Sequence, residues 1–132
     1  GLPVAQVRAG DPYETQCQQS ARALAQRLEL PDGAWALTYQ SRFGKAEWLQ
    51  PYLSEVLQQR AREGARRIDV LCPGFAVDCL ETLEEIAVEN AELFRAAGGQ
   101  ALHYIPALNA STAHARALAA IARRELLPKE NA

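Results

Sequence analysis

The sequence has no methionine, three cysteines and no long hydrophobic run. Cys17, Cys72 and Cys79 form an odd set without a CxxC pair, so we expect neither a disulfide framework nor a typical zinc site. A reducing cytoplasmic location fits this cysteine usage, with peripheral membrane contact as an alternative. No apolar stretch approaches the roughly 20 residues that cross a bilayer. Because position 1 is also not methionine, we expect a piece of a longer protein or a processed form.

The chain also lacks the marks of several common function classes. Its net charge of −2 does not favour nucleic-acid binding, which usually needs a basic face. The dinucleotide motif GxGxxG, the phosphate-loop ending GK[ST] and the nucleophile motif GxSxG are all absent. The loop CPGF, residues 72–75, joins a predicted strand to a predicted helix but has one glycine, so it is a weak phosphate-site candidate.

Helical and strand-like periodicities alternate along the chain. They predict helices over 14–30, 53–63, 79–97 and 111–124, strands over 35–40, 68–72 and 101–105, a loop-like opening segment and a frayed tail (LLPKENA). This alternation predicts one domain over 1–132 of the α/β class, a three-layer α/β/α sandwich with a mostly parallel sheet. Functional groups then collect after the strand ends, in the loops 41–51, 73–77 and 107–110.

Four acidic residues share one face of the predicted helix over 79–97. They are Asp78, Glu81, Glu85 and Glu89, at spacings of three, four and four residues. One interpretation is structural, with Asp78 and Glu81 as a capping box and the others on a solvated face. The other is functional, because aligned carboxylates can bind a cation or accept protons. Spacing alone does not decide between them.

Trp48 lies in the loop that follows the first predicted strand, near Arg42, Phe43 and Tyr52. A tryptophan in such a loop can cover the core or offer a flat face to a planar ligand. Composition does not separate these two interpretations.

Four segments together resemble the C-terminal half of ferrochelatase, which inserts ferrous iron into protoporphyrin IX to make protohaem. They are GDPY (10–13), TYQSRFGKAEWLQPY (38–52), LCPGFAVDCLETLEEI (71–86) and AGGQALHYIPALN (97–109). The resemblance spans nearly the whole chain and implies a chelatase-like, Rossmann-like fold whose first strand is missing. It also implies haem biosynthesis as the process, with protoporphyrin IX and ferrous iron as substrates.

The resemblance also implies roles for individual residues. Glu81 corresponds to the glutamate that faces the metal-insertion site, and Glu85 and Glu89 continue from it along a helix that the family often bends into a π-type turn. The implied catalytic residues are Glu81 and Glu85, and the implied metal ligands are Glu81, Glu85 and Glu89. The implied substrate-binding residues are Gln40, Ser41, Trp48, Tyr13 and Asp11. If these acids lie close together, we expect them to raise one another's pKa values, which suits a proton acceptor.

The chain departs from the family pattern in three places. Cys79 stands where other members carry histidine, and Ala87 where some carry an acid. No cysteine cluster follows, so we expect no iron–sulfur cluster and no tightly bound cofactor, with iron as a substrate only. The family's active-site histidine, a strand and the N-terminal half would precede Gly1. We therefore expect the isolated chain to be inactive and to self-associate through an open sheet edge.

Two other functions stay open. A sirohydrochlorin-type chelatase shares this architecture but typically uses histidines at the metal, and His103 and His114 are isolated in the sequence. A non-catalytic module that binds a tetrapyrrole or a protein partner is the second alternative.

Overall fold

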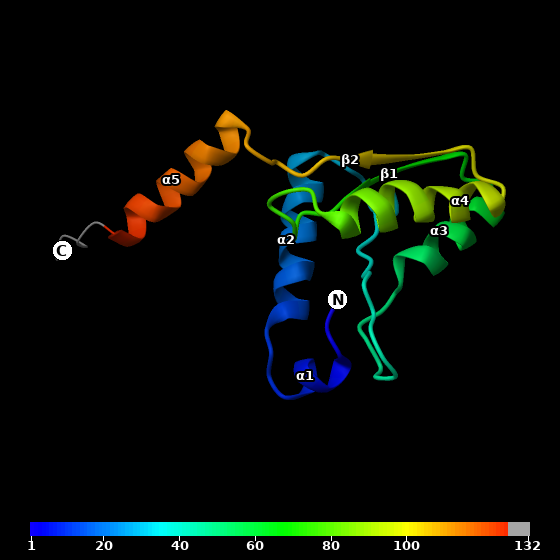
Figure 1. The fold of residues 1–132 in the computed structure, drawn as a ribbon, viewed down its shortest axis with the longest axis horizontal. Helices are drawn as coiled ribbons and strands as arrows, with labels where there is room; N and C mark the ends of the chain where they lie inside the picture. Colours follow the sequence, from blue (N-terminus) through cyan, green and yellow to red (C-terminus); the bar gives the residue numbers. More distant parts are fainter. Residues whose placement is uncertain (127–132) are drawn as a thin grey trace.

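The structure is a computed structural model that describes residues 1–126, and Figure 1 shows how its elements are arranged. The elements, in order, are α1 (Val4–Arg8), α2 (Tyr13–Arg27), α3 (Leu53–Arg62), β1 (Arg67–Leu71), the π-helix η1 (Glu81–Asn90), α4 (Ala91–Ala96), β2 (Ala101–Ile105) and α5 (Thr112–Leu126). Helix α5 projects away from the rest of the chain in Figure 1 and has no buried residue. The predicted frayed tail lies outside the described residues, except for Leu126.

Strands β1 and β2 pair in parallel, in a register that runs from Arg67 opposite Ala101 to Leu71 opposite Ile105. The connection between them contains η1 and α4, as expected for a parallel crossover. This arrangement confirms the predicted α/β class with a parallel sheet. Exposure alternates along both strands, so one face of the sheet is half-buried and the other is exposed in the described part of the chain.

The hydrophobic core lies between the half-buried face of the sheet and the helices α3, η1 and α4. Its buried members are Leu53, Leu57, Ala61, Ile86 and Phe94. The half-buried strand residues Ile68, Val70, Leu102 and Tyr104 pack against it. Because η1 supplies Ile86 to this cluster, the core fixes the side of η1 that faces the sheet.

Two glycines end the helical segment formed by η1 and α4. Gly98 has φ +107, a left-handed conformation that glycine adopts at little cost. The amide of Gly98 donates to the carbonyl of Arg95, and the amide of Gly99 donates to the carbonyl of Phe94, both at 3.0 Å. This pair of bonds is a Schellman motif. A Cβ on Gly99 would overlap the ring of Phe94, so this position has no room for a side chain.

Three expectations about secondary structure need correction. The predicted strand over 35–40 is absent, because Tyr39 pairs with the chain around Tyr52 in a single parallel bridge and its neighbours have no sheet partner among residues 1–126. The opening segment contains the short helix α1, whose five residues are too few to show a periodicity. The helix predicted over 79–97 is a π-helix followed by an α-helix, as the family resemblance implied.

Candidate functional site

The π-helix η1 carries two rows of side chains. One row is buried and consists of Thr82, Ile86 and Asn90. The other row is acidic and consists of Glu81, Glu85 and Glu89, each one residue before a buried one. Both rows repeat every four residues, so the acids run along the edge of the buried row. π-Helical turns are rare and cluster at functional sites, which directs attention to this edge.

The three acids of this row differ in their surroundings. Glu85 is half-buried, whereas Glu81 and Glu89 are exposed. The pKa of Glu81 is lowered, first by a hydrogen bond from the Cys79 side chain and then by one from its own backbone amide. The expected mutual raising of pKa values is therefore wrong for Glu81. Its carboxylate faces water and receives hydrogen bonds, and both conditions favour the charged form.

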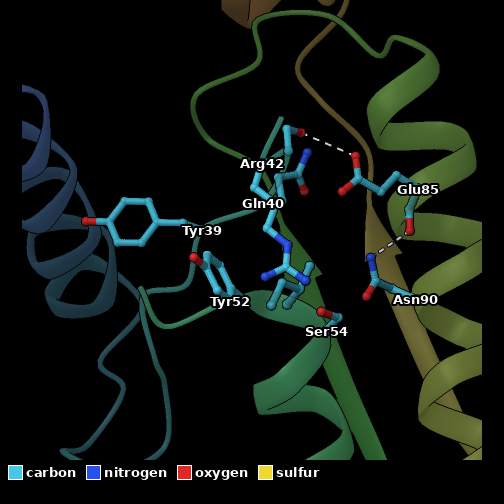
Figure 2. Close-up of a pocket in the computed structure, with 9 residues that line it drawn as sticks. Tyr39, Gln40, Arg42, Tyr52, Ser54, Glu85 and Asn90 are labelled. Atoms are coloured by element: carbon cyan, nitrogen blue, oxygen red, sulfur yellow. Dashed lines mark hydrogen bonds between the residues drawn. The ribbon is translucent and has the colours of Figure 1, made fainter. Parts of the chain in front are cut away.

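A cavity of about 110 Å³ lies beside Glu85 (Figure 2). It is lined by Tyr39, Gln40, Ser41, Arg42, Tyr52, Leu53, Ser54, Glu85 and Asn90. These residues come from the extended segment before α3, from the start of α3 and from η1. The cavity thus lies where the loop after the predicted first strand meets the acidic row.

Ser41 connects these two elements directly. Its hydroxyl donates a 3.2 Å hydrogen bond to the Oε2 atom of Glu85. Ser41 has φ 61, a left-handed conformation that is unfavourable for residues other than glycine and asparagine. Backbone strain of this kind is concentrated at functional sites.

Two polar side chains that line the cavity have atoms without a hydrogen-bond partner among the described residues. They are the Nε2 atom of Gln40 and the Oδ1 atom of Asn90. The Nδ2 atom of Asn90 donates a 2.7 Å bond to the carbonyl of Glu85 (Figure 2). Buried polar atoms usually have partners, so these two are suited to bind water or a polar ligand group. Tyr39 also has an unpartnered hydroxyl, but its side chain points towards α2 in Figure 2.

A positive charge lies at the same cavity. The guanidinium carbon of Arg42 is 4.7 Å from the centroid of the Tyr52 ring, a cation–π distance. The side chain is exposed, so this contact orients Arg42 more than it stabilises the fold.

Three residues that the sequence assigned to substrate binding do not line this cavity. The Nε1 atom of Trp48 donates to the carbonyl of Phe43 at 3.0 Å, and the Trp48 backbone pairs with Pro3. The Oδ1 atom of Asp11 accepts a 2.9 Å bond from the amide of Tyr13, at the start of α2. The pKa of Tyr13 is raised to about 12, first by burial and then by the neighbouring Cys17.

The expected capping box is not present. The residue before η1 is Leu80, and no side chain caps the helix. Asp78 instead accepts hydrogen bonds from Tyr104, Asn109, Thr82 and the backbone of Ala107. These bonds hold the pKa of Asp78 at about 2, with Asn109 as the largest cause.

Comparison of the sequence with known proteins identifies one family. The ferrochelatase family model matches residues 1–126. The chain belongs to the ferrochelatase family. The ferrochelatase of Nitrosococcus oceani is 59% identical over 118 residues, which cover 89% of this chain and 32% of that protein. That of Methylococcus capsulatus is 59% identical over 115 residues, covering 87% of this chain and 35% of that protein.

The match covers only part of each ferrochelatase relative. A third one, from Thioalkalivibrio sulfidiphilus, is 52% identical over 126 residues, which cover 96% of this chain and 34% of that protein. The chain therefore spans about a third of the length of the curated ferrochelatases that it matches. The sequence prediction of the family is confirmed.

The family resemblance named some of the residues that line this cavity. Gln40, Ser41 and Glu85 were predicted and lie together, whereas Asn90 was missed. Asn90 follows Ile86 by four residues, as Ile86 follows Thr82, so a polar residue lies on the buried row, and this signal could have identified Asn90. Within residues 1–126, no three His, Cys, Asp or Glu side chains are grouped so as to hold a metal ion. None of the helices in that range has the length and apolar character needed to span a bilayer.

Proposed function

We propose that this chain forms one wall of a ferrochelatase active site, in which ferrous iron is inserted into protoporphyrin IX to give protohaem. The observation that carries the proposal is the convergence of Gln40, Ser41 and Glu85 on one cavity beside the π-helix, in a chain of the ferrochelatase family. Gln40 and Ser41 belong to the QSRFG segment, and Glu85 to the acidic row, so two separate motifs of the family meet here.

The size of the cavity supports a shared active site. Pockets for drug-sized ligands occupy about 300–1,000 Å³, and a porphyrin is at least as large as such a ligand. The cavity of about 110 Å³ is too small to enclose one. The rest of the porphyrin-binding surface then comes from the other two thirds of a ferrochelatase, which are a partner of this chain. We infer that the isolated chain neither binds porphyrin tightly nor inserts iron.

The acidic row suits two steps of metal insertion. Carboxylates are hard oxygen donors that bind a divalent metal weakly enough to release it, so Glu81, Glu85 and Glu89 can pass ferrous iron towards the macrocycle. Insertion also displaces two pyrrole protons, and an ionised carboxylate can accept one. The lowered pKa of Glu81 keeps that carboxylate ionised near neutral pH, which favours cation binding, but it also makes Glu81 a weaker base than a carboxylate with a raised pKa. We therefore assign Glu81 and Glu85 as proton acceptors and as donors to the arriving iron.

The proposal also covers the cofactor, the porphyrin contacts, the location and the self-association of the chain. Iron enters as a substrate and no resident cofactor is needed. Trp48, Tyr13 and Asp11 contact the porphyrin only after the rest of the enzyme completes the pocket. The enzyme acts in the cytoplasm, at the membrane surface or away from it. The isolated chain self-associates through the free edges of its two-stranded sheet, because unpaired edges invite pairing with other chains.

A chimera tests the function directly. The 118 aligned residues of this chain replace the matching segment of the Nitrosococcus oceani ferrochelatase, to which they are 59% identical. We expect the chimera to insert ferrous iron into protoporphyrin IX, measured by the loss of porphyrin fluorescence, and to support a ferrochelatase-deficient bacterium without added haem. A folded chimera that inserts no metal would contradict the proposal. Activity with sirohydrochlorin in place of protoporphyrin would identify the other type of chelatase.

The isolated chain provides the second arm of this test. Titration with protoporphyrin IX is expected to give no saturable fluorescence quenching at micromolar concentrations. Tight binding by the chain alone would instead favour a tetrapyrrole-binding module. Sedimentation of the same sample tests self-association, and a monomer at high concentration would contradict it.

A further inference from the structure

Asp78 lies where the loop after β1 meets the loop after β2. Its Oδ1 atom accepts a 2.7 Å hydrogen bond from the Tyr104 hydroxyl and a 3.2 Å bond from the amide of Ala107. Its Oδ2 atom accepts a 2.7 Å bond from the Nδ2 atom of Asn109. All three donors belong to β2 or the loop that follows it. A single carboxylate therefore connects the carboxyl ends of both strands.

Asn109, in the loop after β2, also accepts a hydrogen bond from Asp78. Its Oδ1 atom accepts a 2.8 Å bond from the amide of Asp78, so the two residues exchange hydrogen bonds in both directions. Its own amide donates to the carbonyl of Ala76 at 3.0 Å. Asn109 has φ 49, and asparagine is one of the few residues that adopt this left-handed conformation readily. Conformation and side-chain chemistry together favour asparagine at this position.

Asp78 also contacts the first turn of η1, through Thr82. The hydroxyl of Thr82, which is fully buried in η1, lies 3.2 Å from the Oδ1 atom of Asp78 and 3.1 Å from the carbonyl of Cys79. The same hydroxyl accepts a 3.0 Å bond from the amide of Cys79. Because η1 has no side-chain cap of its own, these bonds connect its first turn to Asp78 and, through Asp78, to β2.

We propose that Asp78 and Asn109 form a clasp that positions the first turn of η1, and with it Glu81 and Glu85, for the reaction. In this role the Asp78 carboxylate is a fixed acceptor and carries no proton during turnover. The catalytic part of this inference rests on the proposed function, whereas the structural part does not. A carboxylate that accepts several hydrogen bonds stays ionised, and the low pKa of Asp78 agrees with that.

Hydrogen exchange of the 132-residue chain tests the structural part. We compare the variants Asp78→Asn and Asn109→Ala with the wild type. Asparagine at 78 would turn an NH₂ group towards the Nδ2 of Asn109, so both variants break the clasp. Amides of residues 81–86 are expected to exchange at least about tenfold faster, because hydrogen bonds to charged groups are the stronger ones. Amides of α3 serve as an internal reference.

Asp69→Asn is the matched control. Asp69 also has a lowered pKa, caused first by Arg67, but it lies on the exposed face of β1. Its variant is expected to leave exchange in 81–86 unchanged. Equal exchange in Asp78→Asn and wild type would overturn the clasp.

Kinetics of the chimera test the catalytic part, with Tyr104→Phe and Asn109→Ala. Both variants leave the Asp78 carboxylate in place but remove one of its donors. We expect kcat to fall several-fold with little change in KM for porphyrin, and the acidic limb of the kcat–pH profile to stay in place. If Asp78 carried protons, loss of a donor would raise its pKa and move that limb upward, which would overturn the positioning role. An inactive chimera would overturn the proposed function and the catalytic part together, while the exchange result still decides the structural part.

Discussion

Replacing Gly99 by alanine should destabilise the chain, because the new methyl group would overlap the ring of Phe94. Phe94 is fully buried in the core cluster, so its ring has little freedom to move aside. Overpacking of this kind costs roughly 1–3 kcal/mol. Native domains are stable by about 5–15 kcal/mol, so the expected loss is a substantial share. Urea unfolding at 25 °C, followed by circular dichroism, measures it.

A double-mutant cycle tests whether the loss of stability in Gly99→Ala comes from the contact with the Phe94 ring. Leucine at position 94 lacks the ring atoms Cε1 and Cζ that the methyl group would meet. Gly99→Ala should therefore cost at least about 1 kcal/mol less in the Phe94→Leu background, a coupling within the range for residues in contact. Gly74→Ala is the control, since a Cβ there meets nothing within 4 Å, and it should change stability by less than about 1 kcal/mol. Equal costs of Gly99→Ala in both backgrounds would refute the packing described for α4.

Three further predictions concern the site. Burial raises the pKa of the Cys72 thiol to about 11, so at pH 8 roughly one thiol in a thousand is ionised. Iodoacetamide should therefore alkylate Cys72 more slowly than a free cysteine in a peptide. An equal rate of alkylation would contradict the burial of Cys72. The pKa of Asp78 is lowered from 3.8 to about 2, so the stability that its ionised carboxylate contributes is present above about pH 4 and is lost as the pH falls towards 2. Asp78→Asn should therefore lose less free energy of unfolding than the wild type between pH 6 and 2.5. Equal losses would argue against the bonds to Asp78. Ser41→Gly should be more stable than Ser41→Ala by about 1 kcal/mol, because only alanine retains the cost of the left-handed backbone; equal urea midpoints would contradict that conformation.

The repeating patterns in the sequence predicted most of the fold. Helix α3 was expected over 53–63 and occurs at Leu53–Arg62, and β2 was expected and found at Ala101–Ile105. These elements have a clear apolar period and strong stop signals, Gly64 after α3 and Pro106 after β2. The strand predicted over 35–40 was wrong, because aromatic and β-branched residues show only a preference for strands, and a strand also needs a partner.

The site was predicted less completely, for physical reasons. Family motifs identified Glu85, Gln40 and Ser41, but spacing could not show that Glu81 is exposed while Glu85 lines the cavity. Glu81 and Glu85 belong to the same row, so the difference depends on where along η1 the distant segment with Ser41 lies. Asp78 was expected to cap the helix, since an acid at that position suits a capping box. Its actual partners, Tyr104 and Asn109, are 26 and 31 residues away, a separation that local patterns do not report.

Metal insertion by matched acid-to-amide variants of the chimera tests the central claim most directly. Glu85→Gln and Glu81→Gln remove carboxylates of the acidic row that are assigned to the reaction, and Glu84→Gln removes an exposed acid of the same π-helix that lies outside that row. We predict that Glu84→Gln inserts ferrous iron at the rate of the parent chimera, while Glu81→Gln and Glu85→Gln lose at least about tenfold, as expected for a general base. Full activity in both Glu81→Gln and Glu85→Gln would contradict the account.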